Sequence, residues 1–134
     1  MRCEIAGRSR MHRYALALAA STVLAAPLLA APGDMSVATF LAKADALRAK
    51  GPMALMSSDY KLLQSEGKGA GDAYRARLRA ERAAGRPSSC PPKDVKVSSD
   101  KLIAHLRTYP EAVRPRVSMK QAMADYFIRT YPCR

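Results

Sequence analysis

Two cysteines and one histidine are the residues of this chain best suited to nucleophilic or metal chemistry. Cys90, Cys133 and His105 lie downstream of an N-terminal segment that contains Cys3 and His12. A cysteine–histidine nucleophile pair is conceivable, but each downstream thiol is better explained as the disulfide partner of the other. Zinc would need four ligands at paired spacings, which two cysteines and one histidine do not supply. We therefore expect neither a metal site nor a cofactor.

The N-terminal segment has the pattern of a secretory signal peptide. Residues 1–13 carry four arginines against one acid, and residues 14–29 contain no charge and are rich in alanine and leucine. Ala30 and Ala31 follow, before a polar break. A basic start, an apolar centre and small residues at the end are typical of a cleaved export signal. We expect a signal peptide over residues 1–31, cleaved near Ala30 or Ala31.

An uncleaved membrane anchor is the alternative for this segment. Its apolar run is 16 residues long and is interrupted by Pro27, whereas about 20 residues are needed to span a bilayer. The pattern therefore favours cleavage, a periplasmic location and no stable membrane insertion afterwards. Translation from Met11 instead of Met1 would still leave a basic residue, Arg13, before the apolar run.

If the protein is exported, the two remaining cysteines are expected to form a disulfide, and the net charge must be considered without the signal peptide. In an oxidising compartment an even pair indicates a disulfide, so we predict one between Cys90 and Cys133. From Pro32 onward the chain has 19 Lys and Arg against 10 Asp and Glu, a net charge of +9. This excess concerns partners and solubility and not the fold. Export also disfavours nucleic acid as a partner.

The remaining sequence predicts one all-α domain over residues 32–134, a small bundle of about four helices with one disulfide. Apolar residues recur at helical spacing, serines stand at the helix starts, and glycine or proline stands at the ends. A capping box is expected at Ser118 with Gln121. The expected helices cover residues 35–51, 60–85, 99–109 and 118–131, with a short extended piece at 95–97.

A run of glycines, Gly-Lys-Gly-Ala-Gly at positions 67–71, interrupts the second expected helix. A phosphate-binding loop would need a preceding strand and a different spacing, so that function is disfavoured. Glycine weakens a helix by about 1 kcal/mol per residue, which leaves a local break as one alternative. We favour a continuous helix in which small residues on one face allow another helix to approach closely. That face would contain Gly67, Gly71, Tyr74 and Leu78.

Four arginines of the same helix form the candidate partner-binding site. Arg75, Arg79, Arg82 and Arg86 fall on one edge of the helical wheel, beside the apolar face. A solvated helix face is the ordinary explanation of such a row. The functional alternative is an electropositive edge for an acidic protein, because guanidinium groups suit carboxylates. The carboxylates Asp72, Glu81 and Asp125 show no paired arrangement, which disfavours an enzyme.

The second half of the chain resembles the Rap/Tai family of bacterial immunity proteins. The matching elements, in order, are Cys90-Pro-Pro, Val95-Lys-Val-Ser, Leu102 to Leu106, Tyr109-Pro110-Glu111 and Tyr131-Pro132-Cys133. The resemblance covers about residues 88–133. It implies a small helical periplasmic protein that binds and neutralises a peptidoglycan-cleaving amidase delivered by type VI secretion. The matched residues are structural, so no inhibitory residue can be transferred.

Two functional hypotheses follow. The first is a non-catalytic immunity protein that blocks the cleft of an amidase effector. The second is a structural or stress-related envelope protein whose positive charge attracts anionic cell-wall polymer or lipid headgroups. The sequence leaves the oligomeric state open, a homodimer included.

Overall fold

The structure is a computed structural model that describes residues 30–134. The expected signal peptide lies outside the described residues except for its last two positions. Four α-helices and two short 3₁₀ helices, with no strand in the described part, confirm the predicted all-α fold. The elements are α1 (Val37–Ala49), η1 (Gly51–Met56), α2 (Ser58–Ala83), α3 (Ser99–Arg107), η2 (Arg114–Arg116) and α4 (Met119–Thr130).

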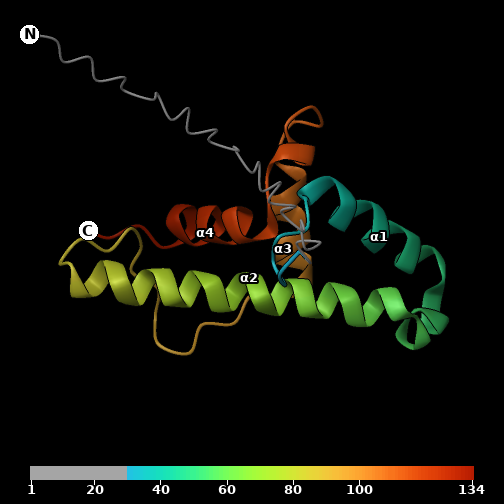
Figure 1. The fold of residues 1–134 in the computed structure, drawn as a ribbon, viewed down its shortest axis with the longest axis horizontal. Helices are drawn as coiled ribbons and strands as arrows, with labels where there is room; N and C mark the ends of the chain where they lie inside the picture. Colours follow the sequence, from blue (N-terminus) through green and yellow to red (C-terminus); the bar gives the residue numbers. More distant parts are fainter. Residues whose placement is uncertain (1–29) are drawn as a thin grey trace, which may run out of the picture.

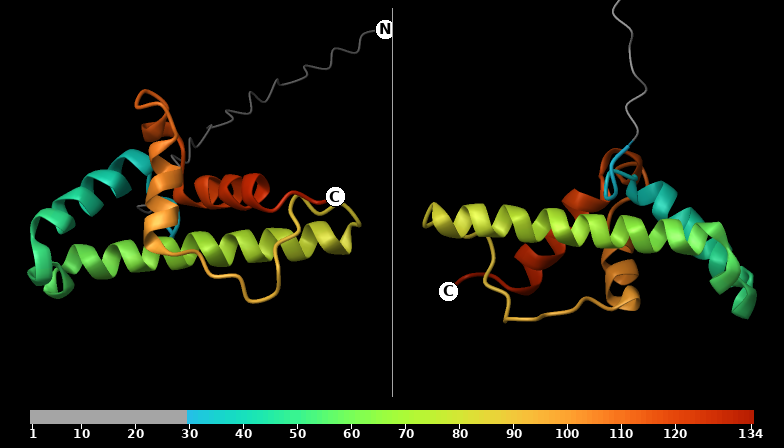
Figure 2. Two further views of the ribbon diagram at one scale, coloured as in Figure 1. Left: turned by 180° about the vertical axis from the view of Figure 1, so that it is seen from behind. Right: turned by 60° about the horizontal axis from the view of Figure 1, so that its bottom comes forward.

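The long helix α2 is the element along which the others are arranged (Figure 1). α4 lies beside the C-terminal half of α2, whereas α3 is steeply inclined to α2 and packs against α1 and α4 (Figure 2). α1 runs from the region of α3 toward the start of α2, which it reaches through η1 (Figure 1). α1 and α2 therefore form a V with η1 at its apex.

Each α-helix begins after a serine whose side chain accepts a backbone hydrogen bond. Ser36, Ser57, Ser98 and Ser118 are these caps, and their Oγ atoms accept from backbone N–H groups at 3.2 to 3.4 Å. Such bonds satisfy N–H groups that have no partner within the helix. The serine half of the capping box is present, since Ser118 accepts from the Gln121 N–H.

The glycine run does not break α2, which is continuous through it as predicted. The predicted face of close approach was right for Tyr74 and Leu78, which are buried, and wrong for the two glycines. A Cβ added at Gly67 would meet nothing within 4 Å, and one at Gly71 would meet only the side chain of Arg75. At the glycine run the buried stripe lies one residue earlier than predicted, at Glu66 and Ala70 instead of Gly67 and Gly71. It consists of Glu66, Ala70, Tyr74 and Leu78.

The hydrophobic core lies where α1, α2, α3 and α4 meet. Tyr74 of α2 and Phe127 of α4 stack with parallel rings whose centroids are 4.0 Å apart. Leu106 of α3 and Met119 of α4 have no exposed surface. Val95 and Val97, where a short extended piece was expected, belong to the loop before α3 and pack against this core.

The segment before α1, residues 31–36, is docked against α2 through a buried carboxylate. The Glu66 side chain is only 6% exposed, and its Oε2 accepts the backbone N–H groups of Gly33 at 2.7 Å and Met35 at 3.1 Å. Pro32 lies directly over Gly69, where a Cβ would come within 2.6 Å of the Pro32 Cβ. Gly69 is therefore the glycine of the run that permits a close approach. Gly33 and Met35, whose N–H groups donate to Glu66, follow both expected cleavage positions and would remain in a chain cleaved there.

The docked segment also satisfies the start of α4. The N–H groups of Met119 and Lys120, which have no partner within α4, donate to the carbonyls of Met35 and Gly33 at 2.9 Å. In return, the Val37 N–H at the start of α1 donates to the Val117 carbonyl at 2.8 Å. The starts of α1 and α4 and the middle of α2 are thus held together around Glu66, Gly33 and Met35. We call this place the Glu66 crossing.

We predict that Gly69→Ala destabilises the protein, because the new methyl group displaces Pro32 and weakens the bonds to Glu66. Overpacking of this kind costs roughly 1–3 kcal/mol. Gly67→Ala is the matched control, since it removes a helical glycine in open space and should gain up to about 1 kcal/mol. Urea unfolding of both variants measures the difference. Equal stability of the two variants would show that the segment is not docked over Gly69.

A candidate partner-binding groove beside the disulfide

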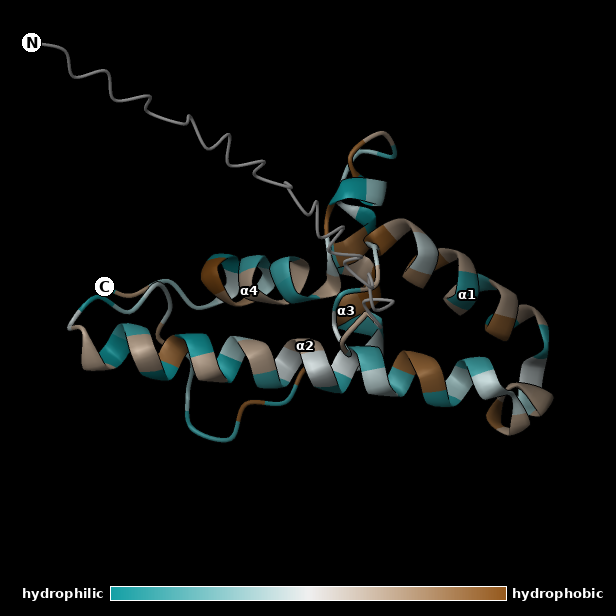
Figure 3. Cartoon of the chain, viewed as in Figure 1, coloured by the Kyte–Doolittle hydropathy of each residue, from teal (hydrophilic) through white to brown (hydrophobic). Residues whose placement is uncertain are grey.

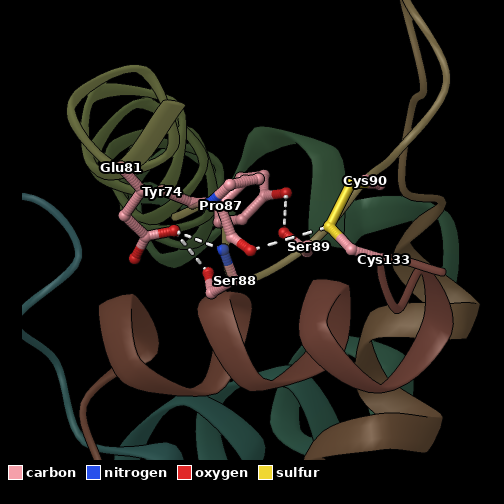
Figure 4. Close-up of a disulfide and its surroundings, with 7 residues drawn as sticks. All are labelled: Tyr74, Glu81, Pro87, Ser88, Ser89, Cys90 and Cys133. Carbon is pink, nitrogen blue, oxygen red and sulfur yellow. Dashed lines mark hydrogen bonds between the residues drawn. A yellow bond between two sulfur atoms is a disulfide. The ribbon is translucent and has the colours of Figure 1, made fainter. Parts of the chain in front are cut away.

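The predicted disulfide joins Cys90 to Cys133 and fixes the loop that follows α2 (Figure 4). The two Cα atoms are 4.9 Å apart, and the Cys90 N–H donates to the Tyr131 carbonyl at 2.8 Å. The bond ties the end of the fold to the loop after the long helix, as the sequence predicted. It also occupies both thiols, so the conceivable cysteine–histidine nucleophile pair is not assembled.

The turn between α2 and the disulfide is held by Glu81. Gly85, with φ of +71°, turns the chain back after α2 ends. The Glu81 carboxylate then accepts the Ser88 N–H at 2.9 Å and the Ser88 hydroxyl at 2.5 Å, and Arg77 pairs with it at 2.6 Å. These hydrogen bonds with Ser88, followed by the one with Arg77, lower the pKa of Glu81 to about 2. Glu81 is thus a structural anion of the turn.

Ser89 connects this turn to the core. It is fully buried, and its hydroxyl lies 2.8 Å from the hydroxyl of Tyr74 (Figure 4). Burial raises the pKa of Tyr74, which the hydrogen bond with Ser89 partly opposes. Since Tyr74 also stacks on Phe127, the disulfide loop, α2 and α4 are fixed relative to one another.

A groove of about 420 Å³ opens between α2 and the loop that leaves Cys90. Its cationic side chains are Arg75 and Arg82 from α2 and Lys93 and Lys96 from the loop, against one acid, Asp94. Apolar and aromatic side chains form the rest of the wall. These are Tyr74, Leu78, Pro91, Pro92, Val95 and Phe127. The arrangement can hold an anionic group that carries some apolar surface.

The structure brings two of the four predicted arginines to this groove. Arg75 and Arg82 line it, and Arg75 also pairs with Asp72 at 2.6 Å. Arg79 is exposed on the same helix but does not line the groove. The prediction was wrong for Arg86, which does not continue the helical row. α2 ends at Ala83 and Gly85 redirects the backbone before Arg86.

Lys93 and Lys96 are groove residues that the sequence analysis missed. They lie in a Pro-rich loop, and nothing in their local pattern places them opposite α2. The path of the loop depends on the disulfide and on Ser89, which are contacts between residues distant in the chain. One feature of the sequence could have located them. Both lysines closely follow Cys90, and the predicted disulfide with Cys133 places Cys90 near the end of α4.

The remaining predicted candidates have structural partners. His105 is half-buried, with Nε2 3.1 Å from the Ala122 carbonyl oxygen and its ring edge-on to Tyr109 and Tyr126. Burial lowers the pKa of His105. Asp125 accepts the hydroxyl of Tyr109 at 2.6 Å. Burial, followed by this contact with Asp125, raises the pKa of Tyr109.

Over residues 30–134 no three His, Cys, Asp or Glu side chains lie close enough together to bind a metal ion. The helices of this described part include none that is long and apolar enough to cross a membrane. Comparison with protein-family models, with curated proteins and with solved structures gives no match to the chain.

We predict that replacing Cys90 and Cys133 with serine lowers the free energy of unfolding by about 2–4 kcal/mol, since a 43-residue separation is no longer constrained. The loss should appear as a lower melting temperature in thermal unfolding. The groove should also lose its shape, because Lys93 and Lys96 follow directly from the disulfide. Two reactive thiols in the untreated native protein would contradict this account.

Proposed function

We propose that this chain is a non-catalytic periplasmic protein of immunity type, which binds and inhibits a peptidoglycan amidase delivered by type VI secretion. The observation that carries the proposal is the cationic groove, because it offers an acidic protein surface four positive side chains around an apolar wall. The resemblance of residues 88–133 to Rap/Tai immunity proteins supplies the identity of the partner class. Export through the expected signal peptide would bring the two proteins into the same compartment.

The residues that carry the resemblance form the frame of the groove. Cys90 and Cys133 make the disulfide, and the two prolines after Cys90 line the groove. Tyr109 is fixed by its hydrogen bond to Asp125, which holds α3 against α4. The motif therefore supports a fixed loop that brings two lysines to the groove: Lys96 lies within a matched element, and Lys93 lies between two of them.

The charges of the groove suit recognition of carboxylates. The guanidinium groups of Arg75 and Arg82 present planar donors, and the lysines act as point charges opposite them. Charges at the rim of an interface mainly raise the association rate, while buried apolar contacts slow dissociation. Pro91, Pro92 and Val95, which line the groove and are at least partly exposed, can provide such apolar contacts beside the cations. We expect an acidic loop or helix of the amidase to occupy the groove.

The second hypothesis, a basic envelope protein without a protein partner, rests on the net charge alone. It predicts binding to cell-wall polymer that depends on salt and on the total charge, wherever the charge is located. Substitutions in the groove can therefore distinguish the two hypotheses, because only the immunity-type hypothesis requires cations at particular positions.

The test uses two double variants with the same change in charge. We predict that Arg82→Glu with Lys96→Glu, which reverses both sides of the groove, slows association with the amidase at least about tenfold and weakens its inhibition. Arg79→Glu with Arg86→Glu, outside the groove, should slow association less than about threefold. The partner is to be identified by testing purified type VI amidase effectors for inhibition, and stopped-flow binding with a peptidoglycan-release assay then measures both effects.

All four substituted side chains are exposed, so folding should be unchanged, which circular dichroism checks. If both double variants slow association equally, the effect comes from the overall charge of the protein and not from the groove. Undiminished amidase activity in a saturating amount of the wild-type protein would refute the immunity function itself.

A further inference from the structure

The apex of the V, at η1, exposes apolar side chains that the rest of the fold does not use. Met53 is 68% exposed, Leu55 63% and Met56 83%, and η1 contributes no buried residue. Leu62, in the second turn of α2, is 38% exposed beside them. The ribbon at η1 is largely tan, the colour of moderately hydrophobic residues, whereas α2 carries hydrophilic residues along its length (Figure 3). Exposed apolar residues gathered at one point usually mark a contact with another surface.

Positive charge surrounds this apex. Lys50 precedes η1 and Lys61 follows it, both are exposed, and neither takes part in an ion pair within residues 30–134. The nearby carboxylate of Asp59 is already paired with Lys43 at 2.7 Å. The hydrogen bond with Lys43 and, to a smaller extent, the charge of Lys50 lower the pKa of Asp59. Residues 50–62 thus contain two lysines and one acid, a small excess of positive charge.

We propose that this apex, residues 50–62, inserts into the headgroup region of an anionic lipid bilayer. Methionine and leucine side chains enter the boundary between headgroups and acyl chains, while flanking lysines reach anionic phosphates. A second copy of the chain is disfavoured as the occupant, because two apices would bring their lysines together. The apex is also convex, as a surface that enters a bilayer must be.

The position of the apex is compatible with the cationic groove, and the lipid proposal does not rest on the proposed function. Arg75 and Arg82 lie 17 and 24 residues after Ser58, which corresponds to about 26 and 36 Å along a helix. The apex and the disulfide end are at opposite ends of the molecule (Figure 1). A molecule held at a membrane by its apex would keep the groove free for a protein partner.

The experiment measures binding of the mature protein, residues 32–134, to vesicles. We expect sedimentation with vesicles of phosphatidylglycerol and phosphatidylethanolamine and at least tenfold weaker binding to phosphatidylcholine vesicles. Replacing Met53, Leu55 and Met56 together with serine should reduce binding at least tenfold without altering the melting temperature, since none of the three is buried. Lys50→Gln with Lys61→Gln should reduce it by roughly tenfold at low salt, whereas Arg79→Gln with Arg86→Gln is the charge-matched control.

A fluorescent reporter separates insertion from charge attraction. The chain has no tryptophan, so Met56→Trp introduces a single probe at the apex, and Ala80→Trp is the control on the exposed side of α2. Only the Met56→Trp emission should shift to shorter wavelength and be quenched by brominated lipid.

Three results would each overturn the proposal. They are undetectable binding to anionic vesicles, unchanged binding of the triple serine variant, and an unshifted Met56→Trp emission in the bound state. Self-association that the triple serine substitution abolishes would assign the apex to a second copy instead.

Discussion

The rest of the structure depends on one buried carboxylate. Glu66 lies near the middle of α2, and a buried polar side chain in this position is tolerated only if hydrogen-bond partners replace water. The donors are the backbone N–H groups of Gly33 and Met35, so the carboxylate draws the docked segment against α2. That segment in turn supplies the carbonyls to which Met119 and Lys120 donate. One side chain therefore connects the starts of α1 and α4 to α2.

The C-terminal end of α2 is fixed by contacts with the following loop, whereas the N-terminal end adjoins a segment without a buried residue. At the C-terminal end, the disulfide, the Glu81 carboxylate and the Ser89 hydroxyl fix the loop that carries Lys93 and Lys96. At the N-terminal end, η1 contributes nothing to the core and leaves its methionines in solvent. Both proposed contact surfaces therefore lie away from the crossing at Glu66, and substitutions at either surface can change binding without changing the fold.

The parts of this structure that the sequence predicts are those with a local pattern. Serine caps, apolar spacing and the prolines marked the four helices, and the two downstream cysteines left one pairing. The helical wheel placed Arg75, Arg79 and Arg82 along one edge because α2 is regular as far as Ala83, but it could not show that only Arg75 and Arg82 line the groove. Arg86 was misplaced because one glycine, Gly85, ends that regularity.

The crossing and the loop lysines could not be predicted in this way. Glu66 bonds to backbone N–H groups 33 and 31 residues away, and a backbone partner leaves no trace in residue type. Gly69 is one of three glycines in the run, and only the path of Pro32 distinguishes it from Gly67. The position of Lys93 and Lys96 likewise follows from distant contacts. Such contacts are set by tertiary structure and not by periodicity.

Native-state hydrogen exchange tests most directly whether the Glu66 crossing holds the fold together. The amide protons of Gly33, Met35, Met119 and Lys120 are the relevant probes, observed by NMR in the mature protein. If the crossing opens only when the protein unfolds, these four amides will exchange with the free energy of global unfolding, like the core amides of α2. Exchange of the Gly33 and Met35 amides at the rate of an unstructured chain, with α2 and α4 still protected, would contradict the account.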